Sequence, residues 1–156
     1  SALDVLTTVA DAYAEDQKFP MAGGDSENMS TEGPAAFDIS KTEELTTSLT
    51  LPESEIKHID DAASLVHMMN ANIFTGAAYH LTDDADMKDF SKAVEENVLS
   101  KQWICGMPDT LVILKADDEY VVTAYGEAEI METFKENAEA SLDGSEVILE
   151  TSVSGN

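Results

Sequence analysis

The sequence predicts an α+β fold: a mainly antiparallel sheet of four or five strands, with two long helices packed on one face and an N-terminal helix in front. Two stretches carry this prediction. Residues 108–142 are typical of two strands, a tight turn and a helix, and the stretch before them shows the same order. The predicted core is therefore strand-strand-helix-strand-strand-helix. The helix starts Asp84-Ala-Asp-Met87 and Glu127-Ala-Glu-Ile130 resemble each other, which suggests a duplication, although chance explains four positions equally well.

The N-terminal third is predicted to be a helix, a loop and short helical pieces. Residues 2–15 place apolar side chains at helical spacing. Residues 16–36 contain adjacent glycines, two prolines and scattered polar residues, which favours a long, mobile loop. A short helix is expected over 41–49, and Thr50-Leu-Pro-Glu53 has the pattern of a capping box. The whole chain is therefore predicted to have three parts: a helix and mobile arm over 1–50, a core domain over 51–150, and a frayed tail over 151–156.

The first hairpin and its helix come next. Residues 60–69 fit either a strand or a buried helix, and we favour a strand because 73–81 has the composition of a hairpin partner. The following helix is expected to be capped by Asp83 or Asp84, with Asp84 and Asp86 in its first turn. Its predicted buried positions are Met87, Phe90, Val94 and Val98.

The second hairpin has the clearest pattern. Residues 110–115 are apolar without a break, which predicts a strand covered on both faces. Residues 116–119 suit a turn, and 120–125 are rich in β-branched and aromatic residues. The next helix has Glu127 and Glu129 in its predicted first turn, and a last strand is expected over 146–150. The predicted apolar stripe of this helix is Ile130, Phe134, Ala138 and Leu142.

The charge of the chain narrows its classes of partner. The 156 residues include 32 acidic and 8 basic side chains, a formal charge of −24, and every basic one is Lys. Arg is the preferred planar fork for phosphate, so nucleic acid, nucleotides and anionic membrane surfaces are poor partners. The charge favours cations and basic partners, or it serves only to keep the protein soluble. No apolar run is long enough to span a membrane.

No motif indicates a catalytic, cofactor-binding or metal site. Cys105, the single thiol, follows a predicted helix C-terminus, where the thiolate is disfavoured, so a buried structural role is expected. His58, His67 and His80 lack metal-ligand spacing, although His67 and His80 fall on the predicted first hairpin and could face each other. Asn28-Met-Ser30 matches a glycosylation acceptor.

Acidic clusters are the remaining candidates, and helix capping and turns explain most of them. They are Asp60-Asp61, Asp83-Asp84-Ala-Asp86 with Asp89, and Asp117-Asp118-Glu119. Counted from Asp84, the second imitates a calcium loop that ends at Glu95, but Lys88 takes a ligand position and Asp89 replaces the required Gly. We therefore expect no specific calcium site.

Carboxylate pairs are the only groups that could support an enzyme. The pairs are Asp117 with Asp118 and Glu127 with Glu129. Acid–base catalysis needs two carboxylates whose environments differ, usually within a cleft, whereas turns and helix starts are solvated. A non-catalytic protein is therefore favoured over a carboxylate-dependent hydrolase.

The layout resembles a family of uncharacterised small lipoproteins, a domain of unknown function, from Gram-positive anaerobic bacteria. The points of resemblance are Leu3-Asp-Val-Leu6, Leu51-Pro-Glu-Ser-Glu-Ile56, Leu81-Thr-Asp83, Lys101-Gln102 and the 111–125 hairpin. The chain departs from that pattern in a shorter region after Gln102 and a longer loop over 16–36. The resemblance implies an α+β fold and anchoring outside the cytoplasmic membrane through a lipid-bearing cysteine ahead of Ser1. It transfers no catalytic residue.

Together these observations predict a non-catalytic, extracytoplasmic protein of the cell envelope, either a membrane-anchored lipoprotein or secreted, that binds something or supports an assembly. Its partner would be an unidentified protein or small ligand, and not nucleic acid. The alternatives are a carboxylate-dependent hydrolase and an acidic decoy that occupies a basic protein. A decoy should display its acids as a continuous stripe.

Overall fold

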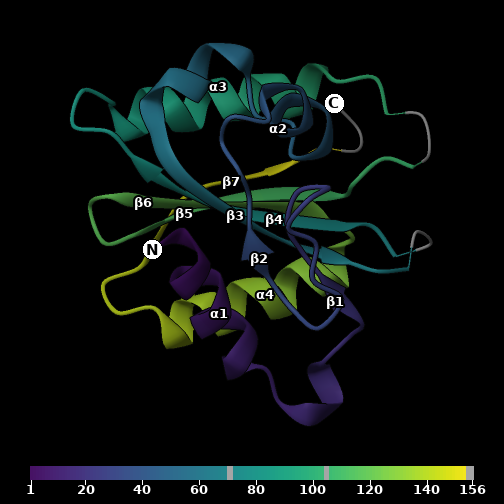
Figure 1. Cartoon of the computed structure of the whole chain (residues 1–156). Coiled ribbons are helices and arrows are strands. Elements are labelled where there is room, and N and C mark those ends of the chain that lie inside the picture. Colours follow the sequence, from purple (N-terminus) through teal and green to yellow (C-terminus); the bar gives the residue numbers. More distant parts are fainter. Residues whose placement is uncertain (70–71, 104–105, 154–156) are drawn as a thin grey trace.

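The computed structural model describes residues 1–69, 72–103 and 106–153. Within them the chain forms an α+β fold built on one antiparallel sheet (Figure 1). The elements are α1 (Ala2–Ala12), the 3₁₀ turn η1 (Glu15–Gln17), β1 (Met21–Ala22), β2 (Ala35–Ala36), α2 (Thr42–Ser48), the 3₁₀ turn η2 (Glu53–His58), β3 (Ile59–His67), β4 (Phe74–Leu81), α3 (Met87–Ser100), β5 (Thr110–Ala116), β6 (Tyr120–Gly126), α4 (Ala128–Ser141) and β7 (Glu146–Ser152).

The sheet contains two hairpins joined side by side. The strand order is β1-β3-β4-β6-β5-β7, and β2 also pairs with β3. Both expected hairpins are present, since β3 pairs with β4 and β5 pairs with β6. The expectation of four or five strands is too low, because the segment expected to be a loop contributes β1 and β2 to the edge of β3. Two-residue strands are too short to leave a periodic pattern in the sequence.

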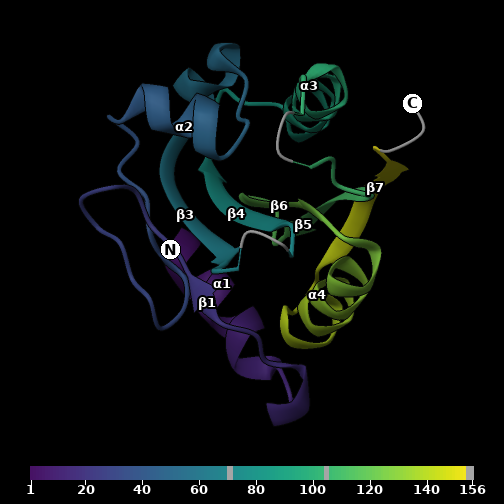
Figure 2. The same ribbon diagram turned by 90° about the vertical axis from the view of Figure 1, so that its right-hand side faces the viewer.

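Helices cover both faces of the sheet, and the expectation that the two long helices share one face is wrong. Figure 2 shows α2 and α3 on one face and α1 and α4 on the other. The physical reason lies in the strands. Along β5, Leu111 and Ile113 belong to one core and Val112 and Leu114 to the other. Both faces are apolar, so a single layer of helices would leave one of them in water.

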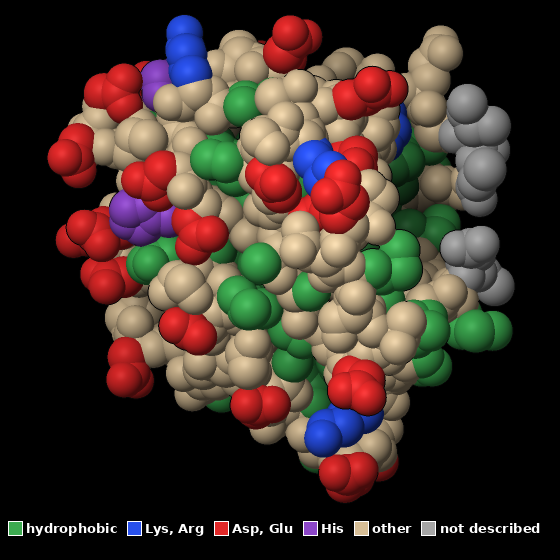
Figure 3. Space-filling model, in the orientation of Figure 1, with side chains coloured by type: hydrophobic (Ala, Val, Ile, Leu, Met, Phe, Trp, Pro, Cys, Tyr) green, Lys and Arg blue, Asp and Glu red, His purple; other side chains and the backbone are tan. Residues whose placement is uncertain are grey.

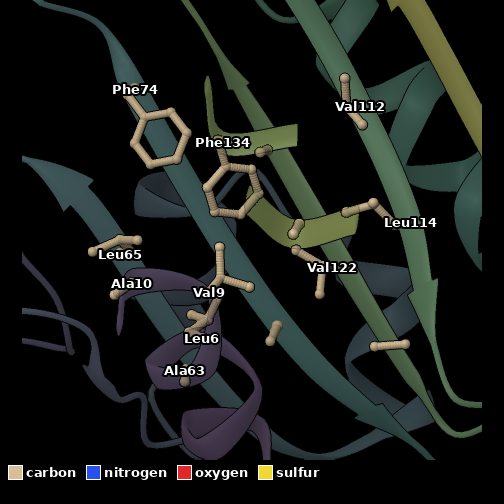
Figure 4. Close-up of a cluster of buried hydrophobic side chains, with 14 of the residues drawn as sticks. Leu6, Val9, Ala10, Ala63, Leu65, Phe74, Val112, Leu114, Val122 and Phe134 are labelled. Carbon is tan, nitrogen blue, oxygen red and sulfur yellow. The ribbon is translucent and has the colours of Figure 1, made fainter. Parts of the chain in front are cut away.

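The core under α1 and α4 forms around paired aromatic rings (Figure 4). The ring centroids of Phe74 and Phe134 lie 5.2 Å apart, and Leu6 and Val9 of α1 pack beside them. The apolar stripe of α4 differs from the expected one. Its buried residues are Met131, Phe134 and Ala138, while Ile130 and Leu142 are only partly buried.

The second core lies under α2 and α3. Phe90, Val94 and Val98 are its α3 residues, whereas Met87 is only partly buried. Phe90 packs edge-on against Tyr79 of β4, with ring centroids 5.8 Å apart. Because the two long helices lie on opposite faces, the sheet separates two hydrophobic cores.

The N-terminal 50 residues belong to the folded body, so the core extends beyond the expected 51–150. Helix α1 contributes to the first core, and Leu45 and Leu49 to the second. At the other end, the expected frayed tail starts too early. Thr151 and Ser152 belong to β7, and Val153 is fully buried and donates its N–H to the Asp109 carbonyl at 2.9 Å.

The segment between β1 and β2 is organised by a buried carboxylate. Asp25 is 1 % exposed. It accepts backbone N–H bonds from Glu27, Asn28 and Asp38 at 2.7–3.1 Å, and the Asn28 amide donates to it at 2.8 Å. Burial opposes the charged form, but these hydrogen bonds together lower the pKa of Asp25 to about 2.

Several helix ends differ from those that the sequence predicts. Pro52, not Thr50, precedes η2, and no side chain among the described residues caps that turn. Asp86 caps α3 by accepting from the Asp89 N–H at 3.0 Å, so neither Asp83 nor Asp84 is the cap. Glu127 is the N-cap residue of α4, which leaves Glu129 as the acidic residue of its first turn. Helix α1 also ends at Ala12, three residues earlier than expected.

Candidate functional site: the carboxylate–histidine cluster

Strands β3, β4 and β6 bring a histidine between carboxylates that are distant in sequence. His80 on β4 pairs in register with Asp61 of β3 on one side and Tyr120 of β6 on the other. Its Nδ1 lies 2.5 Å from the Asp60 Oδ1, and its Nε2 lies 3.5 Å from the Glu119 Oε2. Both ring nitrogens of His80 therefore face a carboxylate.

This geometry favours the imidazolium form of His80. The hydrogen bond with Asp60 is the main cause that raises the pKa of His80, and Glu119 adds to it, while burial opposes both. The Tyr120 ring packs edge-on against the imidazole, with centroids 4.9 Å apart. The imidazolium ring directs one N–H toward each of the two carboxylates.

Two further carboxylates approach the same place. Burial raises the pKa of Tyr120, and the charges of Asp61, Glu119, Asp4 and Asp60 raise it further. Asp61 also accepts the Ala2 N–H at 2.9 Å, which fixes the start of α1 beside the hairpins. Figure 1 places the N-terminus and the β5–β6 turn on one flank, and Figure 3 shows acidic side chains gathered around histidine on that flank.

We call this surface the His80 cluster. It consists of Asp4, Asp60, Asp61, His80, Glu119 and Tyr120. Its residues come from four well-separated parts of the sequence, so no local motif marks it. The pairing register of the first hairpin is the one signal that could have found it, because that register places Asp61 opposite His80.

The other two histidines lie elsewhere. His67 is at the opposite end of the β3–β4 hairpin, so the idea that it faces His80 is wrong. It stacks on Phe19 at 4.7 Å, its Nδ1 accepts the Met69 N–H at 3.0 Å, and burial lowers its pKa. His58 has a buried Nδ1 with no hydrogen-bond partner in the described part of the chain.

The remaining acidic candidates serve local structure. Asp84 accepts from the Thr82 hydroxyl, which lowers the pKa of Asp84. Asp117 occupies the left-handed turn between β5 and β6 with φ of 67°, and it accepts the Asp118 N–H at 2.8 Å. Among the described residues, no group of three or more Asp, Glu, His or Cys side chains is arranged to hold a metal ion.

A shallow groove of about 280 Å³ places Glu129 near His67. Tyr13 and Phe19 also line this groove. The Tyr13 hydroxyl is buried and has no partner among the described residues, and the Glu127 charge acts on His67.

Of the other sequence candidates, Cys105 lies outside the described residues. Asn28 is exposed, but its amide is engaged by Asp25.

Comparison with known proteins gives no match, whether to a protein-family model, a curated protein or a solved structure. None of the described helices is long and apolar enough to cross a membrane.

Proposed function

We propose that this protein is a non-catalytic binding or assembly module of the cell envelope, located outside the cytoplasm, and that the His80 cluster is its surface for a basic protein partner. The observation that carries the binding surface is the placement of His80 between Asp60 and Glu119, with two further carboxylates around Tyr120. The envelope location rests on the family resemblance of the sequence.

The chemistry of the cluster suits a cationic side chain. Within the described residues, no Lys forms an ion pair with Asp60, Asp61 or Glu119. A partner Lys or Arg can therefore replace the single His80 charge there, and Tyr120 offers an aromatic face to the same cation. Such complementarity raises association rates and selects for basic partners.

The acidic decoy is less well supported. On the face seen in Figure 3, acidic side chains form separate groups between neutral and apolar ones, not a continuous stripe. A local cluster suits one docking point better than imitation of an extended polyanion.

A carboxylate-dependent hydrolase is the second candidate, and the groove that holds Glu129, His67 and Tyr13 favours it. In this alternative function, Glu129 is the general acid or base of the hydrolysis, and neutral His67 acts together with it. Hydrolysis of a panel of ester, amide and glycoside substrates that disappears in Glu129→Gln would establish this activity in place of the proposed one.

The proposed function is tested by titrating the protein with a fluorescent decalysine peptide at 0.05 and 0.15 M NaCl. The double variant Asp60→Asn/Glu119→Gln should weaken binding about tenfold, as loss of a charged contact does. Glu96→Gln/Glu136→Gln changes the net charge equally on exposed helical positions and is the matched control. Equal weakening in both double variants would leave only non-specific attraction and overturn the assignment of the cluster.

The pH dependence of peptide binding is an independent test, because protonation of His80 competes with the peptide for the His80 cluster. Because the pKa of His80 is raised, the imidazolium fills the cluster increasingly as the pH falls through that value. Peptide affinity should therefore decrease from pH 8 to pH 6 in the native protein and stay flat in His80→Gln. An affinity that falls equally in both proteins contradicts the role of His80.

A further inference from the structure

A second candidate site lies on another face, between α3 and the edge strand β7. It is a groove of about 600 Å³, a size typical of small-molecule sites. Met87, Ile148 and Leu149 supply its apolar wall, and its polar residues are Lys88, Ser91, Lys92 and Glu95. The groove shares no residue with the His80 cluster, so the two sites stand independently.

The groove wall contains a buried hydroxyl, that of Ser91. Ser91 is 4 % exposed, and its Oγ forms no hydrogen bond with any described residue. A buried, unpaired hydroxyl costs free energy, which a ligand acceptor can recover by accepting that hydrogen bond. Ser91 also lines the groove, so this hydroxyl is an unpaired donor beside any occupant.

Two lysines flank that hydroxyl along α3. Lys88 and Lys92 are exposed and form no ion pair in the described part of the chain, whereas Lys18, Lys41 and Lys135 each have a carboxylate partner. Glu95 also lines the groove, so its charged lining consists of two lysines and one glutamate. In a chain of formal charge −24, this is a local excess of positive charge beside an apolar wall.

We infer that the groove binds an anionic amphiphile of the carboxylate-headed acyl type. The head group accepts from the Ser91 hydroxyl and pairs with Lys88 and Lys92, and the acyl chain lies on Met87, Ile148 and Leu149. A ligand with a single negative charge is attracted by the two lysines. The net negative charge of the protein repels it much less than it would repel a polyanion.

A peptide fits the same groove less well. From Met87 to Glu95 the α3 wall is roughly 12 Å long, at 1.5 Å per residue. A strand added to β7 would meet an irregular edge, because Ile148 is an extra residue in the pairing with β5. Glu146 and Glu150 flank that point, and each forms an ion pair with a lysine of its own chain.

The test is a calorimetric titration of the protein with dodecanoate, kept below its micelle concentration, at neutral pH and 0.15 M NaCl. We expect saturable binding of one molecule per chain. Acetate has the head group alone, and dodecyltrimethylammonium has the same tail with the opposite charge, so neither should bind in this way. Absence of saturable dodecanoate binding, or equal binding of the cationic analogue, overturns the inference.

Variants of Lys88 and Lys92 test whether these lysines bind the head group of the ligand. Lys88→Gln/Lys92→Gln should weaken dodecanoate binding about ten- to a hundredfold, as loss of charged hydrogen bonds does. Lys18→Gln/Lys57→Gln makes the same net-charge change at exposed lysines outside the groove and should change it less than about twofold. Equal effects of the two pairs overturn the site.

Ser91→Ala separates a ligand contact from a structural role. The variant should bind dodecanoate about tenfold more weakly while its melting temperature is not lowered, because the lost hydroxyl has no partner among the residues that the structure describes. Unchanged affinity in Ser91→Ala overturns the assignment of this hydroxyl. Binding of an acidic apolar peptide through Lys88 and Lys92, without dodecanoate binding, overturns the ligand class.

Discussion

At the scale of single residues, Thr50 shows how polar contacts hold an unfavourable backbone conformation. Its φ of 58° lies in the left-handed region that β-branched residues avoid. Its hydroxyl shares a hydrogen bond with the Tyr125 hydroxyl at 2.9 Å and accepts from the Lys101 ammonium at 3.0 Å. Its carbonyl accepts from the Asn97 amide at 2.8 Å. Thr50 thus joins the segment after α2 to α3 and β6.

Two substitutions separate the contribution of the Thr50 hydroxyl from the cost of the positive φ. Thr50→Ala keeps the backbone strain and leaves the Tyr125 hydroxyl and the Lys101 ammonium without this partner, so it should cost about 1–3 kcal/mol of unfolding free energy. Thr50→Gly loses the same hydroxyl but relieves the positive φ, so it should be the less destabilised variant by about 1 kcal/mol. Urea denaturation measures both. A glycine variant less stable than the alanine variant contradicts the strain argument.

Asp25 makes a second prediction at this scale, on acid stability. Its folded pKa of about 2 lies below the ordinary 3.8, so its contribution is complete above the ordinary value and is lost as the pH falls from about 4 to about 2. The difference corresponds to about 2 kcal/mol. Asp25→Asn should lose that amount at pH 7, and its deficit should vanish near pH 2. Exposed Asp16→Asn is the control and should match the native protein throughout.

At the scale of elements, the sheet separates the two helix layers energetically. Phe90 and Phe134 are both fully buried, but they belong to different cores. Phe134→Ala and Phe90→Ala should each cost about 3–5 kcal/mol. The costs should add within about 0.5 kcal/mol, because the two residues belong to cores on opposite faces of the sheet. Additivity is best measured with Phe90→Leu and Phe134→Leu, milder changes that keep the double variant folded. A coupling energy well above that limit would mean that strain crosses the sheet.

The sequence predicted the elements better than their arrangement. Apolar runs and turn residues marked both hairpins, and helical spacing marked α1, α3 and α4. A stripe shows which side of a helix is buried but not which face of the sheet it covers, which explains the error over α3 and α4. The His80 cluster was missed for a related reason. Asp60, His80 and Glu119 are brought together only by strand register, which single-residue patterns do not specify.

At the scale of the whole molecule, the charge of −24 makes stability depend on salt. Within the described residues, four of the eight lysines form ion pairs with acidic side chains, so repulsion among carboxylates opposes the compact state. Screening acts over about 10 Å at 0.1 M ionic strength. The melting temperature should therefore rise from 0.01 to 0.15 M NaCl. Millimolar CaCl₂ at matched ionic strength should add nothing further, and a large extra rise would reveal a specific calcium site.

The two edges of the sheet differ in a way that limits self-association. One edge is made of β1 and β2, each two residues long, which offer too few consecutive donors and acceptors to guide a foreign strand. The other edge is β7, with seven residues. The irregularity at Ile148 hinders strand addition at this edge, and a sheet that can be extended at one edge only can pair with one copy of itself at most. Growth through the sheet therefore stops at a pair, and concentrated solutions of the native protein should contain no fibrils.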